Sequence, residues 1–253
     1  MHIPPLDPNV AARKGFREPE ERIKRFWKDV SVEAGEGGWR VLLDGRTPKT
    51  PAGAALILPS EALARLVADE WSAQGEHLDP ATMPATRLAS TAIDRIGQAR
   101  EGVAEEVTRY LGSDALCYFA DAPQGLVVEQ EARWRPWLDW AARELSLPLR
   151  QAEGIGHVAQ SDSVLRHGRE LVLGLDDFSL TGLATATGLF GSAVLALGVQ
   201  RGALSGVEAF ELSRLDEAWQ ERQWGVDEEA AQRTAARRAE AELLDRWLAA
   251  LRD

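Results

Sequence analysis

The sequence of 253 residues contains little of what several protein classes require. Its single cysteine, Cys117, excludes an internal disulfide framework and any multi-cysteine metal site. With 40 acidic against 29 basic residues, the chain lacks the basic surface that nucleic acids and anionic membranes bind. We therefore expect a protein of a reducing compartment whose main partner is neither a nucleic acid nor a membrane.

The motifs of catalysis and cofactor binding are also missing. Neither common phosphate-binding loop occurs, and the glycines of GEGG (residues 35–38) precede a predicted strand rather than a helix. There is no H-E-x-x-H zinc pattern and no G-x-S-x-G serine elbow. We therefore expect no cofactor, no metal ion and no catalytic residue.

Cys117, the single cysteine, is the one thiol that could act as a nucleophile. A reactive cysteine needs a lowered pKa and a base close by, and the histidines all lie far from it in sequence. They are His2, His77, His157 and His167. Apolar and aromatic neighbours favour packing of Cys117 in a buried strand or turn.

Two segments bear on targeting and membranes. The first residues, MHIPPLDPNVAARKGF, lack the apolar core of a signal peptide, and their basic residues are too sparse and proline-broken for a transit peptide. Residues 178–200 carry no charge and are long enough to span a bilayer, but serine, threonine and glycine dilute them. We interpret this stretch as one buried central helix without stable membrane insertion. Its small residues, which permit close helix packing, are Gly182, Ala186, Gly191 and Ala193.

The first third of the chain has strand patterns. Residues 29–34 and 39–44 flank GEGG as a hairpin does, and residues 54–58 predict a further strand. Ser60 then caps a helix with an apolar stripe. That stripe consists of Leu63, Leu66, Val67 and Trp71.

From Ala85 onward the apolar residues recur with the helical period. The fold class is therefore α+β, with a small β-containing domain at 1–84 and a larger, predominantly α-helical domain at 85–253. The predicted helices cover 86–100, 101–112, 129–145, 161–173, 179–200, 206–223 and 228–251.

Four stretches together resemble one known family. They are VLLDGRTPKTPAG, VADEWSAQGEHLDPATMPATRLASTAID, YLGSDALCYFADAP and LSRLDEAWQERQWG. In this order they are similar to the assembly chaperones that bind the alpha subunit of the F-type ATP synthase catalytic head. The resemblance runs from about Phe26 to the last helix.

The resemblance implies a non-enzymatic function. Such a chaperone binds unassembled alpha subunit, shields its subunit-contact surface and leaves as beta subunit docks. We expect a monomer in the bacterial cytoplasm, or in the mitochondrial matrix if the source is eukaryotic. Two alternatives remain: an enzyme that uses carboxylates such as Asp44, Asp114 or Glu240, and a general holdase.

The last predicted helix places one acid among apolar residues. Asp227 caps this helix, and Glu240 falls in the middle of its apolar arc. Arg237 and Arg233 lie on the same side, so an internal salt bridge is one interpretation and a docking acid the other. The resemblance implicates an acidic residue of this helix, which matches Glu240, or Glu242 if the register slips. The apolar arc consists of Leu243, Leu244, Trp247, Leu248 and Leu251.

Trp224 precedes Gly225 at the end of the preceding helix. A hydrophobic contact that closes the helix end is the favoured interpretation, and an exposed anchor for a partner is the other. The candidate partner-binding residues are Glu240, Arg237, Arg233, Leu244 and Trp224.

Overall fold

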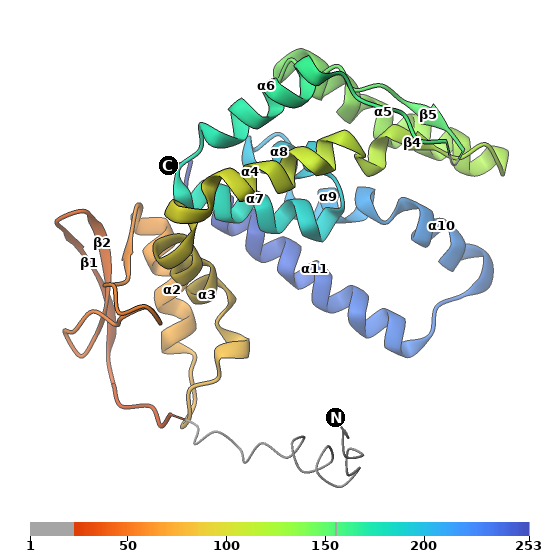
Figure 1. Cartoon of the computed structure of the whole chain (residues 1–253). Coiled ribbons are helices and arrows are strands. Elements are labelled where there is room, and N and C mark those ends of the chain that lie inside the picture. Colours follow the sequence, from red (N-terminus) through yellow and green to blue (C-terminus); the bar gives the residue numbers. More distant parts are fainter. Residues whose placement is uncertain (1–22, 155, 253) are drawn as a thin grey trace, which may run out of the picture.

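The computed structural model describes residues 23–154 and 156–252. The N-terminal stretch interpreted above for targeting signals lies outside these residues. A three-stranded antiparallel sheet and helix α2 (Glu61–Ser72) occupy one end of the molecule, and the rest is mainly helical (Figure 1). This arrangement confirms the predicted α+β class.

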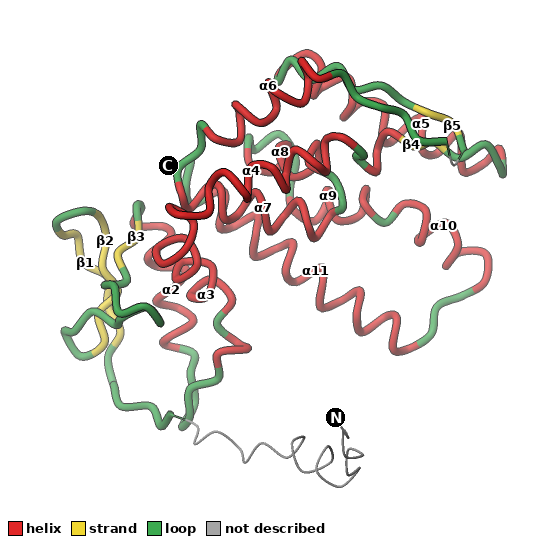
Figure 2. The backbone as a smooth tube through the Cα atoms, in the orientation of Figure 1, coloured by secondary structure: helices red, strands yellow, loops and turns green. Residues whose placement is uncertain are grey.

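Figure 2 shows how little strand the molecule contains beside its helices. The strands are β1 (Val30–Gly35), β2 (Gly38–Leu43) and β3 (Ile57–Leu58), with a separate parallel pair of β4 (Tyr118–Phe119) and β5 (Ala152–Glu153). The first α-helices are α2 (Glu61–Ser72), α3 (Pro84–Thr91), α4 (Gly97–Gly112), α5 (Gln124–Glu144) and α6 (Asp162–Leu173). The remaining ones are α7 (Asp177–Phe190), α8 (Ala193–Gln200), α9 (Gly206–Ser213), α10 (Leu215–Trp224) and α11 (Glu228–Ala249).

The N-terminal hairpin and its helix follow the sequence patterns. Gly35 pairs with Gly38 at the β1–β2 turn, where Gly37 has a φ of 83° that favours glycine. The Ser60 hydroxyl accepts a hydrogen bond from the Leu63 N–H at 3.1 Å and caps α2 as predicted. The buried side of α2 then packs against β1 and β2.

The uncharged segment forms two buried helices where one was predicted. Gly191 adopts the left-handed conformation, with a φ of 66°, and ends α7. The Ser192 hydroxyl then caps α8 by accepting from the Leu195 N–H at 3.1 Å. Hydrophobic periodicity does not indicate this break, because both helices are buried on nearly all sides and neither has a polar face. No helix of the described part of the chain combines the length and hydropathy needed to cross a membrane.

Three other helix boundaries differ from the prediction. The segment at 206–223 breaks at Arg214, between α9 and α10. The helices predicted at 86–100 and 101–112 run together, because a π-helical turn at Ala92–Ile96 joins α3 to α4. Helix α5 begins at Gln124, earlier than its periodicity indicated.

Cys117 is packed into the core, as predicted. It ends a 3-10 turn (Ala115–Cys117) and has no exposed surface. Burial and the nearby Asp114 carboxylate raise the pKa of the Cys117 thiol to about 12, which keeps it protonated and unreactive. Asp114 is itself buried and accepts from the N–H groups of Leu116 and Val194, at 3.1 and 3.0 Å, so it joins this turn to α8.

Helix α11 is packed over its C-terminal half only. Its buried residues begin at Ala241, and residues 231–240 are exposed or half-buried. Glycines allow the close packing: a Cβ on Gly182 of α7 would lie 2.7 Å from the Trp247 ring, and one on Gly206 of α9 would lie 2.2 Å from the Ala241 carbonyl oxygen. The helix is therefore anchored at one end and projects from the body at the other (Figure 1).

One hydrophobic cluster continues from the sheet into the helices. It includes Val41 of β2, Leu63 of α2 and Leu244 of α11. The Ser60 hydroxyl also donates to the Ala250 carbonyl oxygen at 2.5 Å. The division into domains at residue 84 stays a prediction, and α3, which begins there, contacts both α2 and α7.

Candidate protein-binding groove

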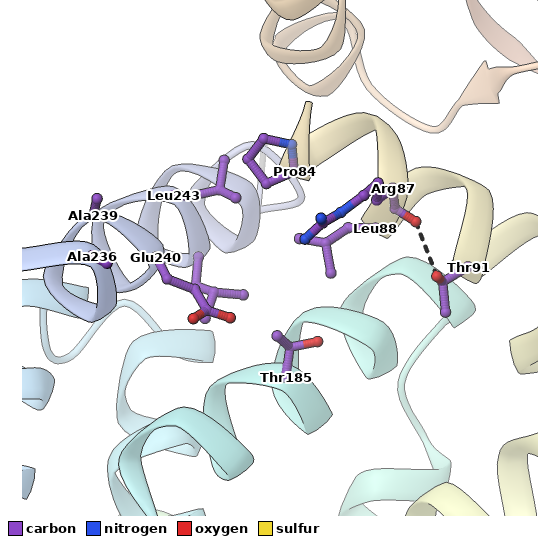
Figure 3. A pocket seen from close by; sticks show the side chains of 10 residues that line it. Pro84, Arg87, Leu88, Thr91, Thr185, Ala236, Ala239, Glu240 and Leu243 are labelled. Carbon is purple, nitrogen blue, oxygen red and sulfur yellow. Dashed lines mark hydrogen bonds between the residues drawn. The ribbon is translucent and has the colours of Figure 1, made fainter. Parts of the chain in front are cut away.

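A groove of about 430 Å³ lies between α3, α7 and α11, at the point where α11 leaves the body. We call it the Glu240 groove. Helices far apart in sequence therefore form its walls (Figure 3). Its lining residues are Pro84, Arg87, Leu88, Thr91, Thr185, Ala236, Ala239, Glu240, Leu243 and Leu244.

Glu240 is the one carboxylate among these residues. Its side chain extends from α11 toward the space between α11 and α7 (Figure 3). It is exposed, because the packed half of the helix begins one residue later, at Ala241. Leu243 and Leu244 beneath it are buried, at 5% and 0% exposure. The Glu240 carboxylate thus lies at the edge of the groove, above the buried side chains of Leu243 and Leu244.

The arginines proposed as internal partners of Glu240 bind elsewhere. The Arg237 guanidinium donates to the Leu189 carbonyl oxygen at 2.6 Å and so satisfies the C-terminal end of α7. Arg233 pairs with Glu229 at 2.6 Å on the exposed part of α11. Within residues 23–154 and 156–252, no ion pair or hydrogen bond joins either arginine to Glu240. Of the two interpretations of Glu240, the internal salt bridge to these arginines is therefore wrong for the described residues, because Arg237 and Arg233 bind other acceptors.

Trp224 does not close the end of α10, so the favoured prediction was wrong. Its side chain is 79% exposed. Gly225 follows with a φ of 82° and a ψ of 174°, an extended exit that carries the chain away from the helix. The hydrophobic contact of a left-handed helix end does not form on such a path. Trp224 and its neighbour Val226, which is 54% exposed, mark the corner between α10 and α11, away from the groove lining.

The α3 wall of the groove depends on a carboxylate from α2. The Glu70 side chain accepts from the N–H groups of Ala85 and Thr86, at 2.6 and 2.8 Å, and from the Thr86 hydroxyl at 2.8 Å. It thereby caps α3, whose N-cap residue Met83 makes no side-chain bond. Burial raises the pKa of Glu70, although these hydrogen bonds act in the opposite direction.

Sequence reasoning missed this wall. Arg87 and Leu88 lie in one of the stretches that carried the family resemblance, but no local pattern separates them from an ordinary helix surface. Only the approach of α3 to α11 makes them part of a groove. The proline at the start of α3 was the available signal for the helix, though not for its neighbours.

The other acids considered for catalysis have local structural roles. The Asp44 carboxylate accepts from the N–H groups of Lys28 and Asp29, and these bonds lower the pKa of Asp44. Asp114 is bonded to backbone N–H groups inside the core, where burial raises its pKa. Among the described residues, no group of three or more histidine, cysteine or acidic side chains is placed to hold a metal ion.

Known proteins match the chain over its length. The ATP12 chaperone protein model matches residues 24–142. The crystal structure of Atp12 from Paracoccus denitrificans is 44% identical, has a TM-score of 0.84, and covers 89% of this chain and 97% of that one. A solved structure from Agrobacterium tumefaciens is 40% identical, has a TM-score of 0.86, and covers 97% of this chain and 91% of that one. The mitochondrial protein atp12 of Schizosaccharomyces pombe is 26% identical and covers 84% of this chain and 77% of its own length.

These matches define the class as an assembly chaperone, which is a non-enzymatic role. The chain belongs to the ATP12 chaperone family, the family for assembly of the F1 part of ATP synthase. The resemblance inferred from the four sequence stretches is therefore confirmed. The prediction that the chain is not an enzyme agrees with the role named for its relatives.

Proposed function

We propose that this protein binds the unassembled alpha subunit of the F-type catalytic head and shields its contact surface until beta subunit docks. The observation that carries this proposal is the Glu240 groove, in which a carboxylate without an ion-pair partner among the described residues lies beside buried leucine side chains. A free alpha subunit exposes a large, partly apolar surface and is prone to aggregation. A chaperone that acts as a monomer, in the bacterial cytoplasm or the mitochondrial matrix, covers that surface by protein contact alone.

The groove chemistry specifies what the partner has to present. Glu240 can only accept hydrogen bonds when ionised, so its partner group is an arginine, a lysine or an N–H donor. Leu88 and Leu243 offer an apolar contact beside that donor. An ion pair at the edge of an apolar contact is partly shielded from water and salt, which favours a specific interaction.

Replacing Glu240 with glutamine tests this role. The Glu240→Gln variant is expected to unfold at the wild-type denaturant midpoint, because the side chain is exposed. Its capture of alpha subunit is expected to fall at least about tenfold, since a charge-assisted bond of ~1.4 kcal/mol or more is lost. Pull-down from cells that co-express tagged chaperone with separate alpha or beta subunit measures this capture.

Glu242→Gln is the matched control. Glu242 lies on the same helix, is exposed and pairs with Arg238 at 3.5 Å, so this change leaves capture at the wild-type level. Full capture by Glu240→Gln, or loss of its fold, contradicts the assigned role of Glu240. Capture of beta but not alpha subunit overturns the proposed partner. Equal suppression of aggregation for unrelated proteins identifies a general holdase instead.

A further inference from the structure

A second groove lies on the opposite side of α3 and has a volume of about 660 Å³. We call it the Phe26 groove. Arg87 and Thr91 line both grooves, so α3 is a ridge between them. Its apolar lining residues are Ile23, Phe26, Pro48, Pro51, Trp71, Leu78, Pro80 and Met83.

Two large apolar side chains at this groove are exposed although their backbone is held in place. Ile23 and Phe26 are 59% and 71% exposed. The Ile23 carbonyl oxygen accepts from the Leu78 N–H at 2.8 Å, and the Arg25 N–H donates to the Glu76 carbonyl oxygen at 2.9 Å. The Phe26 ring stands edge-on to Trp27, with ring centres 4.9 Å apart. A fixed apolar surface in contact with water is a mark of an interaction site.

The charges around the Phe26 groove are mainly positive. Lys49, Arg87 and Arg95 line it, and in the part of the chain that the structure describes none of the three forms an ion pair. The single lining acid, Asp94, accepts from the Thr50 hydroxyl at 2.6 Å and the Ala52 N–H at 3.0 Å, so both of its oxygens are already hydrogen-bonded, and three lining cations remain against this one acid. The groove therefore has a local excess of positive charge, although the whole chain has a net charge of −11.

We propose that the Phe26 groove is a second docking site, which binds a segment of a partner protein whose apolar side chains are flanked by carboxylates. The apolar side chains of that segment contact Phe26 and Met83, and its carboxylates pair with Arg95 and Lys49. The charge preference is opposite to that of the Glu240 groove, which accepts a donor. This inference goes beyond the proposed function, because it holds whichever subunit the Glu240 groove binds.

Binding of designed peptides tests this proposal. The probe is a fluorescein-labelled peptide of repeated Glu-Leu-Phe-Glu units, and its counterpart carries lysine in place of each glutamate. Fluorescence anisotropy with the full chain is expected to detect binding of the acidic peptide only, with an affinity that falls as salt rises. Equal binding of both peptides, or of neither, overturns the proposal.

Variants assign the binding to the groove. Phe26→Ser and Arg95→Glu are each expected to lower the affinity for the acidic peptide at least about tenfold, which corresponds to ~1.4 kcal/mol. Lys28→Glu makes the same change of charge outside the groove lining and leaves the affinity within about twofold. Glu240→Gln also leaves it unchanged, so failure here and failure of the proposed function are separate results. Loss of peptide binding in Glu240→Gln with retention in Phe26→Ser overturns the assignment.

A photo-crosslinker identifies the occupant. Ser90 is half-buried and lines the Phe26 groove, so benzoyl-phenylalanine at this position reports what lies in it. Crosslinking to the acidic peptide, reduced by excess unlabelled peptide, supports the proposal. Crosslinks that persist instead within the same chain, or between two copies of it, overturn the assignment of a separate partner.

Discussion

Replacing Trp247 with alanine is expected to lower the free energy of unfolding by about 3–5 kcal/mol. Trp247 has no exposed surface and stacks on Phe178 with ring centres 6.2 Å apart. Its Nε1–H donates to the Phe178 carbonyl oxygen at 3.1 Å. The missing Cβ of Gly182 leaves room for this ring, so alanine leaves a cavity between α7 and α11. Denaturant unfolding followed by circular dichroism measures the loss.

Trp224→Ala is the matched control for that prediction. Trp224 is the last residue of α10 and is 79% exposed, so its removal is expected to change the free energy of unfolding by no more than about 0.5 kcal/mol. Trp247 is the tryptophan that anchors α11 beside Glu240, so its loss is also expected to weaken the proposed capture of alpha subunit. Equal stability of the two variants contradicts the packing described for α11.

Substitution of Gly206 by alanine is expected to destabilise the protein by about 3 kcal/mol. The new Cβ would lie 2.2 Å from the Ala241 carbonyl oxygen and 2.9 Å from the Asp245 Cβ. The nearest atom belongs to the backbone of α11, which cannot move aside as the end of a flexible side chain can. Relief of this clash requires α9 and α11 to separate. Because α11 forms one wall of the Glu240 groove, this movement would also displace that wall. Thermal and denaturant unfolding measure the effect.

Gly188→Ala, on α7, is the matched control, because it is expected to raise the stability that Gly206→Ala lowers. Gly188 is an exposed position of α7, and a Cβ there has no atom within 4 Å. Alanine has the better helix propensity, so this change is expected to stabilise by about 0.4–1 kcal/mol. If Gly206→Ala were as stable as Gly188→Ala, the close approach of α9 to α11 would be refuted.

Local chemistry was sufficient to predict the short-range features of the fold. The hairpin at GEGG and the helix caps at Ser60 and Asp227 formed as expected, because each depends on a few neighbouring residues. The helix break at Gly191, between the buried helices α7 and α8, was missed. A side chain covered on all sides has no periodic signal, so hydrophobicity alone cannot locate such a break.

The candidate site was only partly accessible from the sequence. The helical wheel drew attention to Glu240 among apolar residues, and the structure places that carboxylate at the groove edge. The wheel also suggested pairing with Arg237, which instead bonds to a carbonyl of α7. A wheel describes one helix and contains no information about the acceptors that a neighbouring helix brings close.

By itself the sequence determined the α+β class, the family through its four motifs, and the acid of the last helix that stands out from the others. The tertiary structure decided which side chains share a groove. Arg87 on α3 and Glu240 on α11 are separated by more than half of the chain, and they line one groove because α3, α7 and α11 pack on a common core. It also decided that Trp224 is exposed and Trp247 buried, since burial depends on neighbours that residue type and spacing do not specify.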